Sequence, residues 1–281
     1  MRGKTVVITG ATSGIGEVAA QKLAAMGARI IFVARDKNRG QATLARLRQA
    51  GPNLDHRVHY ADLSHLSDMK HVAEEIAIAE PHIDVLMNNA GAIFDRRYVT
   101  EDGLERTFAL NHMSYFVITQ ILRVRLLATP GARIVNTSSD AHRKARVDFN
   151  DLQVSKAYGA FKAYCKSKLY NILFTRELAR QLEGLDVTAN SLHPGLVDTR
   201  FGDAGQGVIA SGFRVIKKFG LTPEQGAETL IFLASSKEAA GITGKYFHKC
   251  APATPTREAQ DDDSAKRLWE ESAHIASKLS L

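Results

Sequence analysis

The chain has 281 residues, of which 44% are hydrophobic and 24% are charged, and its formal net charge is +7. These proportions are ordinary for a soluble globular protein and exclude disorder as the default. The basic residues are dispersed, which favours a solvated basic surface over a nucleic-acid-binding arm and leaves a small phosphate-bearing ligand open.

The N-terminus enters an apolar strand at Thr5, without a preceding signal-peptide core. No stretch approaches the ~18 apolar residues of a membrane span. The two cysteines, Cys165 and Cys250, lack the paired spacing of a zinc or disulfide framework, and the ten histidines show no HExxH pattern. We therefore expect a cytoplasmic protein with no integral membrane segment and no metal.

Apolar runs of strand length alternate with amphipathic runs of helix length. The first kind predicts strands at Thr5–Thr9, Arg29–Val33, Val58–Tyr60, Val85–Met87, Arg133–Thr137, Val187–Leu192 and Lys245–Phe247. The second kind predicts helices at Ile15–Met26, Arg39–Gln49, Leu66–Ala79, Gly103–Leu127, Ala160–Leu182 and Thr222–Leu233. Ser64 and Thr222 are candidate N-caps, and Pro223 follows Thr222 at the first helical position.

This alternation predicts a single α/β domain over residues 1–281, a Rossmann-type doubly wound parallel sheet of about seven strands with helices on both faces. The least regular segment, Asp198–Leu221, mixes glycines with apolar residues. It is either an apolar flap over the substrate or a helix packed on the core.

A glycine-rich turn joins the first predicted strand to the first predicted helix. Glycines at such a turn let the backbone approach a pyrophosphate, and the helix N-terminus supplies free N–H groups and partial positive charge. The strand–turn–helix context favours dinucleotide binding over an empty turn. The residues expected to contact the cofactor here are Gly10, Thr12, Ser13, Gly14, Ile15 and Gly16.

The end of the second strand bears on the choice between NAD and NADP. A carboxylate usually stands there to accept from the ribose 2′-OH of NAD, but this chain has Ala34 followed by Arg35. Arg35, helped by Arg39, offers a charged fork for a 2′-phosphate. Asp36 complicates this interpretation, and Arg35 could instead be surface charge. We expect NADP(H) as the cofactor.

Four further segments complete a family resemblance: NNAG (88–91), IVNTSS (134–139), YCKSK (164–168) and HPGLVDT (193–199). With the glycine turn, they resemble the short-chain dehydrogenase/reductase family over nearly the whole chain. The helix from Tyr164 and the C-terminal RLWEES (267–272) are similar to its retinol dehydrogenase and WW-domain oxidoreductase branch. The resemblance implies NADP(H) and lipophilic carbonyl or alcohol substrates.

The resemblance also implies roles for individual residues. Asn111 would bend a long helix and hold a water for a proton relay. The other implied cofactor contacts are Asp62 and Leu63 at the adenine, Asn89, Ala90 and Gly91 on the adenosine ribose side, and Pro194, Gly195, Val197 and Thr199 at the nicotinamide end. Each motif could instead be only a strand end or a turn.

Two tyrosine–lysine pairs have the same spacing, Tyr158 with Lys162 and Tyr164 with Lys168. Residues four apart share one face of a helix. Either lysine could therefore lower the pKa of its phenol and make that group a proton donor or acceptor.

Gly159 marks a loop or a fraying helix start inside the first pair, whereas a sustained amphipathic helix follows Tyr164. Tyr164 precedes Pro194 by 30 residues, which matches the family spacing, and Tyr158 precedes it by 36. We assign Tyr164 and Lys168 as the catalytic pair, with both contacting the cofactor. Tyr158 becomes a candidate pocket-wall residue, and Lys166 is expected to be solvated on another helix face.

Ser138 and Ser139 point to opposite faces of a strand, and the family alignment selects Ser139 to polarise the substrate oxygen. Ser139 precedes Tyr164 by 25 residues, longer than the usual span in the family. The extra residues would be an insertion near the active-site mouth that shapes the pocket or only decorates the surface.

The sequence thus predicts an NADP(H)-dependent oxidoreductase that interconverts an alcohol and its aldehyde or ketone, with Tyr164 as proton donor or acceptor. The partner would be a small molecule and not a nucleic acid. A homodimer or homotetramer is expected, because the helices carrying Asn111 and Tyr164 often pair subunits in this family. The alternative is a non-enzymatic NADP(H)-binding sensor or scaffold on the same fold.

Overall fold

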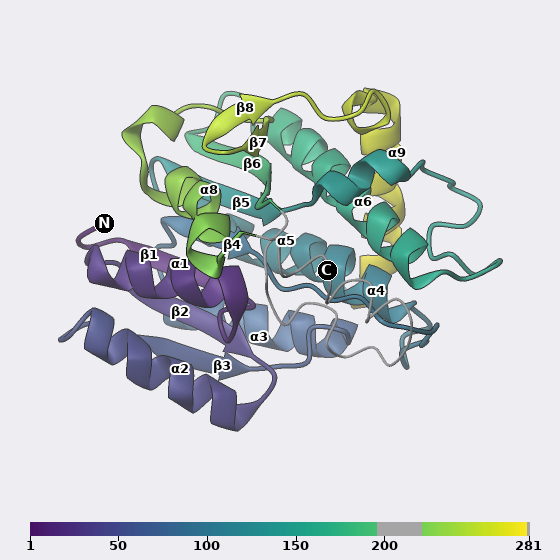
Figure 1. Cartoon of the computed structure of the whole chain (residues 1–281). Coiled ribbons are helices and arrows are strands. Elements are labelled where there is room, and N and C mark those ends of the chain that lie inside the picture. The colour runs from purple at the N-terminus through teal and green to yellow at the C-terminus, as the bar shows by residue number, and fades with distance from the viewer. Residues whose placement is uncertain (196–220, 280–281) are drawn as a thin grey trace.

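The first strand, β1 (Thr5–Thr9), buries Val6, Val7 and Ile8 completely. Strands buried on both faces are typical of parallel sheets that helices cover from either side. The computed structural model, which describes residues 1–195 and 221–279, shows this arrangement around β1 (Figure 1).

The other strands are β2 (Arg29–Ala34), β3 (Arg57–Tyr60), β4 (Val85–Asn88), β5 (Ala132–Thr137), β6 (Val187–His193), β7 (Tyr246–His248) and β8 (Ala251–Ala253). They form one sheet in the order β3-β2-β1-β4-β5-β6-β7-β8. Each neighbouring pair is parallel except β7 and β8. The doubly wound fold is confirmed. The expectation of about seven strands, all parallel, misses the antiparallel edge strand.

Helices cover both faces of this sheet. One face carries α1 (Gly14–Ala25), α2 (Lys37–Ala50) and α8 (Pro223–Ser235). The other carries α3 (Leu66–Ala79), α5 (Ser114–Leu127) and α6 (Ala160–Gln181), with α9 (Asp262–Ala276) packed outside α6. Figure 1 shows α1 and α8 side by side on the first face. The short helices are α4 (Arg106–Phe108), η1 (Ala109–Met113), η2 (Asp140–Lys144), η3 (Lys237–Ala239), η4 (Glu258–Gln260) and η5 (Ser277–Leu279).

The two predicted N-caps have different outcomes. The Thr222 hydroxyl accepts from Gln225 N at 3.3 Å, and Gln225 accepts from Thr222 N at 3.0 Å, so α8 starts with a capping box. Ser64 is not a cap, since the N-cap of α3 is His65. Ser64 instead donates its hydroxyl to Asp62 at 2.7 Å.

The long helix predicted from Gly103 is interrupted in the structure. Glu105 caps α4 by accepting from Thr107 N and Phe108 N, and a π-helical turn, η1, then precedes α5. Asn111 lies in that turn, and π-turns within helices often occur at functional sites. The distortion expected at Asn111 is therefore present.

Helix α9 was not predicted, although Asp261 and the following acidic residues are a helix start signal. Its Trp269 stacks on Phe174 of α6 with ring centroids 5.7 Å apart, and it meets the edge of Phe116 of α5 at 5.0 Å. The C-terminal helix therefore covers part of the outer surface of α5 and α6.

Strand order reverses between β1 and β4, because the chain runs from β1 to β2 on one side and returns to β4 on the other. Parallel sheets of this type bind ligands at the carboxyl ends of the strands beside such a switch point. The fold thus marks the edge of the sheet where the site should lie. No helix within the described ranges is long and apolar enough to cross a membrane.

Candidate active site

Six predicted site segments begin directly after a strand. They follow β1 at Gly10, β2 at Arg35, β3 at Ala61 and Asp62, β4 at Asn89, β5 at Ser138 and Ser139, and β6 at Pro194. The strands are parallel, so their carboxyl ends lie along one edge of the sheet. The structure brings these segments to the same edge, beside the switch point.

The glycine turn packs tightly against the segment after β4. A Cβ on Gly10 would lie 2.8 Å from Ala90 Cα, and one on Gly16 would overlap the Gly10 carbonyl and the Asn89 amide. Gly10 also has a φ of +71° and Gly14 a φ of +59°, which favour glycine. Packing or backbone conformation therefore favours glycine at each of these three positions, and the turn can approach a ligand closely.

Helix α1 begins at Gly14, immediately after this turn. Among the described residues, the Ser13 side chain makes no capping hydrogen bond to the helix. The backbone N–H groups of the first turn are therefore available to an anion, as a pyrophosphate site requires. Thr12 lies in the glycine turn, and Ile15 lies in the first turn of α1.

Thr9 joins the turn to the NNAG segment, a role that was not predicted. Its hydroxyl accepts from Asn89 N and from Ala90 N, each at 3.0 Å. The Asn89 amide donates to the carbonyls of Thr9 and Gly10, each at 3.2 Å. A hydroxyl at the carboxyl end of a predicted strand was the signal that could have identified Thr9.

Two arginines lie beside the glycine turn. Arg39 donates to the Thr12 carbonyl at 3.1 Å, and the Arg35 guanidinium lies 3.8 Å from the Asp62 carboxylate. Asp36 caps α2 by accepting from Arg39 N at 2.8 Å, so its carboxylate is engaged by the helix start. Arg35 and Arg39 are therefore the side chains beside this turn that could hold an anionic group.

Asp62 and Leu63 follow β3, and Leu63 is buried. Burial alone would raise the pKa of Asp62, but hydrogen bonds from Ser64 and the charges of Arg35 and Arg106 lower it overall. Asp62 is therefore ionised at neutral pH. Its carboxylate pairs with Arg35 and Arg106 near the adenine end of the predicted site.

Tyr164 and Lys168 lie one turn apart on α6, which starts at Ala160 with Gly159 as its N-cap. Tyr164 is half-buried, whereas Lys168 is 2% exposed. The Lys168 ammonium lies 5.7 Å from the centre of the Tyr164 ring and donates to the Thr137 carbonyl at 3.0 Å. The lysine is thus fixed between the last residue of β5 and the tyrosine.

In the protein alone, burial disfavours the charged form of both side chains. Burial raises the pKa of Tyr164 to about 12, which outweighs the opposite effect of hydrogen bonding with Ser139. Burial also lowers the pKa of Lys168 to about 7. The spacing of the pair predicts that the lysine lowers the pKa of the phenol. In the folded chain, desolvation is the larger effect.

The two serines after β5 have different partners. The Ser138 hydroxyl is buried and donates to the Lys168 carbonyl at 2.7 Å, so it holds the helix and is not available to a substrate. Ser139 caps η2 by accepting from Ala141 N at 3.2 Å, and its side chain hydrogen-bonds with Tyr164. The structure therefore brings Ser139, Tyr164 and Lys168 together.

Asn111 lies near the lysine. A Cβ on Gly91 would be 3.3 Å from Asn111 Oδ1 and 3.4 Å from Lys168 Nζ, so all three residues border one small space. The Asn111 amide donates to Ala92 O at 2.9 Å and Ser167 Oγ at 3.0 Å, and its Oδ1 accepts from Ala92 N at 2.9 Å. Oδ1 retains a second lone pair, which a relay water could use.

One expectation about the neighbouring residues changes, and Tyr158 stays a candidate pocket-wall residue. Lys166 is not solvated: it is 6% exposed and donates to the Asp151 carbonyl at 2.8 Å, because the insertion folds over that face of α6. Tyr158 donates to Phe94 O at 3.1 Å and Glu105 Oε1 at 3.3 Å. Its hydroxyl thus ties the insertion to Phe94 and to Glu105, the N-cap of α4.

At the nicotinamide end, the structure describes only Pro194 and Gly195. Gly195 has a φ of +91°, which favours glycine, and a Cβ there would displace the end of the Leu221 side chain. Val197, Thr199 and the predicted flap up to residue 220 lie outside the described residues.

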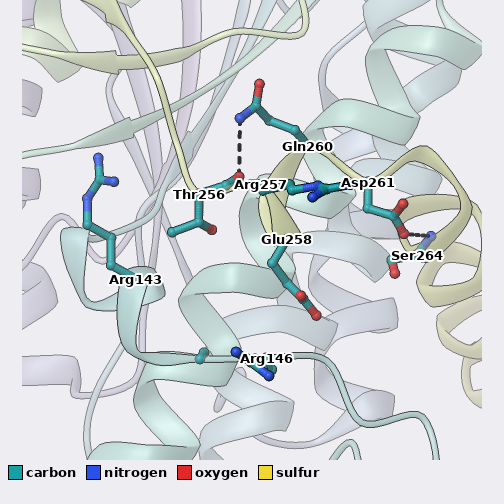
Figure 2. Close-up of a pocket in the computed structure, with 9 residues that line it drawn as sticks. Arg143, Arg146, Thr256, Arg257, Glu258, Gln260, Asp261 and Ser264 are labelled. Atoms are coloured by element: carbon teal, nitrogen blue, oxygen red, sulfur yellow. Dashed lines mark hydrogen bonds between the residues drawn. The ribbon is translucent and has the colours of Figure 1, made fainter.

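A pocket of about 630 Å³ lies elsewhere, between the insertion and the segment before α9. Figure 2 shows Arg143 and Arg146 on one side and Thr256, Glu258 and Gln260 on the other. None of the predicted catalytic residues lines it, so we do not identify it with the active site. In residues 1–195 and 221–279, no group of three His, Cys, Asp or Glu side chains could hold a metal.

A doubly wound sheet with this glycine turn at its switch point defines the class of dinucleotide-binding α/β proteins. A sequence model described as short chain dehydrogenase matches residues 4–206. The chain therefore belongs to the short-chain dehydrogenase family of oxidoreductases, which act on alcohols and carbonyl compounds.

Two retinol dehydrogenases are similar in sequence to this chain over almost its whole length. Retinol dehydrogenase 13 of Homo sapiens is 39% identical over 97% of this chain and 84% of that protein. Retinol dehydrogenase 14 of Mus musculus is 39% identical over 96% of this chain and 85% of that protein.

Among solved structures, an uncharacterized protein from Mycobacterium paratuberculosis is 30% identical, covers 98% of this chain and 94% of its own, and has a TM-score of 0.78. A short chain dehydrogenase from Burkholderia cenocepacia in complex with NADP is 27% identical, covers 92% and 99%, and has a TM-score of 0.68.

Proposed function

We propose that this protein is an NADP(H)-dependent oxidoreductase that interconverts a lipophilic alcohol and its aldehyde or ketone. The observation that carries the proposal is the meeting of Ser139, Tyr164 and Lys168 at the carboxyl end of β5, at the same sheet edge as the glycine turn. A proton donor and a hydrogen-bond donor beside a dinucleotide site are the groups that carbonyl reduction requires.

Each residue has a distinct task in this proposal. The bound cofactor supplies or accepts the hydride. The Tyr164 hydroxyl gives a proton to the carbonyl oxygen in reduction and removes it from the alcohol in oxidation, and the Ser139 hydroxyl donates a hydrogen bond to the same oxygen. Lys168 holds positive charge beside the phenol and orients the cofactor. Asn111 holds a water that returns a proton to Tyr164 after Tyr164 has protonated the substrate.

Oxidation of NADPH with a panel of aldehydes and ketones tests the activity. We expect turnover, with a higher kcat/KM for long apolar aldehydes than for short ones, because the relatives are described as retinol dehydrogenases. Binding of NADPH without turnover of any panel member or of the matching alcohols would instead favour a sensor or scaffold.

The preference for NADP(H) rests on Arg35 and Arg39 beside the glycine turn. We expect Arg35→Ala to weaken NADPH binding about 10-fold or more, as for loss of a charged hydrogen bond to a phosphate, and to leave NADH binding unchanged. Arg48→Ala, at the other end of α2, controls for the loss of one positive charge. A wild-type preference for NADH would overturn this choice of cofactor.

The cytoplasmic location and the homo-oligomer remain proposals. Subunits that pair through the outer surface of α5 and α6 would meet Trp269 of α9, which packs on Phe116 and Phe174. A homodimer or homotetramer therefore has to include α9 or use another surface. Light scattering of the purified chain and fractionation of the cells that produce it test the two proposals separately.

A further inference from the structure

His142 lies in η2, three residues after Ser139, and its side chain is fully buried. Its Nδ1 lies 2.7 Å from the Ser139 carbonyl oxygen. Its Nε2 lies 3.2 Å from the backbone nitrogen of Thr256, which is 114 residues further along the chain. The imidazole thus bridges the catalytic turn and the segment that leads into α9.

These contacts determine which ring nitrogen carries the proton. The Thr256 N–H can only donate, so Nε2 must accept. The single proton of the neutral ring is then on Nδ1, where it donates to the Ser139 carbonyl. The His142 backbone N–H donates to the same carbonyl at 3.1 Å, so two donors fix it.

The surroundings of the ring favour this neutral form. The Tyr246 ring of β7 packs against the imidazole edge to face, with centroids 5.2 Å apart. The charged neighbours Asp140 and Arg143 lie in η2, and Tyr246 of β7 and His193 of β6 are further titratable groups nearby. Burial lowers the pKa of His142 more than hydrogen bonding to Ser139 raises it.

The same connection includes other contacts between the insertion and the C-terminal segment. Arg143 donates to the Thr254 carbonyl at 3.0 Å, and Val147 N donates to Glu258 Oε1 at 2.9 Å. Arg143, Thr256 and Glu258 line the outer pocket in Figure 2. Of these contacts, only the one through His142 reaches Ser139 directly.

We propose that His142 is a positioning residue for Ser139. Its Nδ1–H holds the Ser139 carbonyl, and its Nε2 anchors the ring to Thr256, so the Ser139 hydroxyl stays directed at Tyr164. This inference rests on the proposed function, because it gives His142 an effect on turnover only through Ser139.

A pair of amide variants separates this role from general packing. In His142→Asn, the side-chain nitrogen can take the place of Nδ1 and donate to Ser139, whereas in His142→Gln the amide reaches toward Thr256 instead. We expect His142→Asn to keep kcat within about 3-fold of wild type. We expect His142→Gln to lower kcat by about 10- to 100-fold, since small displacements of a catalytic group cost this much.

The NADPH dissociation constant and the melting temperature of both variants are measured alongside kcat and KM. A positioning role predicts that NADPH binding is retained in both and that only the Gln variant loses kcat. Equal kcat in the two variants would overturn the proposal, as would a loss of kcat that follows the loss of NADPH binding or of thermal stability.

Combination with Ser139→Ala gives a second, independent test, made with the panel aldehyde that wild type turns over fastest. If His142 acts only through Ser139, His142→Gln adds no further loss to that of Ser139→Ala. Losses that multiply would overturn the inference and leave the proposed function intact. Wild-type turnover by Ser139→Ala alone would instead refute the proposed role of Ser139, and the inference would fail with it.

Discussion

Gly16 is the residue on which the geometry of the phosphate turn depends most. A Cβ at this position would overlap the Gly10 carbonyl and the Asn89 amide, both of which are held in place by other contacts. We expect Gly16→Ala to lower the free energy of unfolding by about 2 kcal/mol, as overpacking does, and to weaken NADPH binding. Urea unfolding and fluorescence titration check the two effects.

Gly159→Ala is the matched control for this change. A Cβ on Gly159 would have its nearest neighbour, Lys162 Cβ, at 3.6 Å, and the Gly159 φ of −141° suits any residue. We expect a change within about 0.5 kcal/mol and unchanged NADPH binding. Equal effects at the two glycines would contradict the close packing described for the turn.

Lys168 should make stability depend on pH in an unusual direction. Its folded pKa is about 7, whereas an unfolded lysine titrates near about 10.4. Between these values the unfolded chain binds more protons, so this group adds stability as pH rises, by at most about 1.4 kcal/mol per pH unit. Below about pH 7, both states are protonated and the contribution is constant.

Unfolding of wild type and Lys168→Met by urea at several pH values from 6 to 9.5 measures this contribution. We expect the Met variant to be relatively most stable near pH 6, with its advantage shrinking as pH rises through the range. Lys162→Met, an exposed lysine on the same helix, controls for the loss of one charge. A difference between wild type and Lys168→Met that is independent of pH would contradict a depressed pKa for Lys168.

Helix α9 adds an aromatic side chain to the packing of α5 and α6. Trp269 lies half-buried against Phe174 and Phe116. We expect Trp269→Ala to lower the free energy of unfolding by about 2 to 3 kcal/mol, since a large aromatic side chain leaves a cavity. The exposed neighbour Glu270 provides the control variant, Glu270→Ala, which should be nearly neutral in the same denaturation experiment.

Elements with a strong hydrophobic pattern could be predicted from the sequence, and weaker ones could not. β1 and β2 are continuous apolar runs, and the Thr222 cap has both partners of a capping box close together in the chain. β8 has only three residues, including Pro252, and pairs on one side at the sheet edge. No local pattern distinguishes such a strand from a loop.

At the scale of the whole molecule, the order of motifs predicted which edge of the sheet carries the site. It could not predict contacts made by segments distant in sequence. Lys166 was assigned to solvent because its partner, Asp151, belongs to an insertion whose path has no sequence signal. The hydrogen bond between Thr256 and His142 could not be predicted for the same reason, because it joins two segments that only the folded chain brings together.

In the proposed reaction Tyr164, and not Tyr158, transfers the proton. Tyr164→Phe keeps the ring and removes the hydroxyl, so kcat should fall by at least about 100-fold while NADPH binding is retained. Tyr158→Phe removes a hydroxyl bonded to Phe94 and Glu105, and its kcat should stay close to wild type. Near-normal turnover by Tyr164→Phe, or a larger loss in Tyr158→Phe, would contradict the assignment.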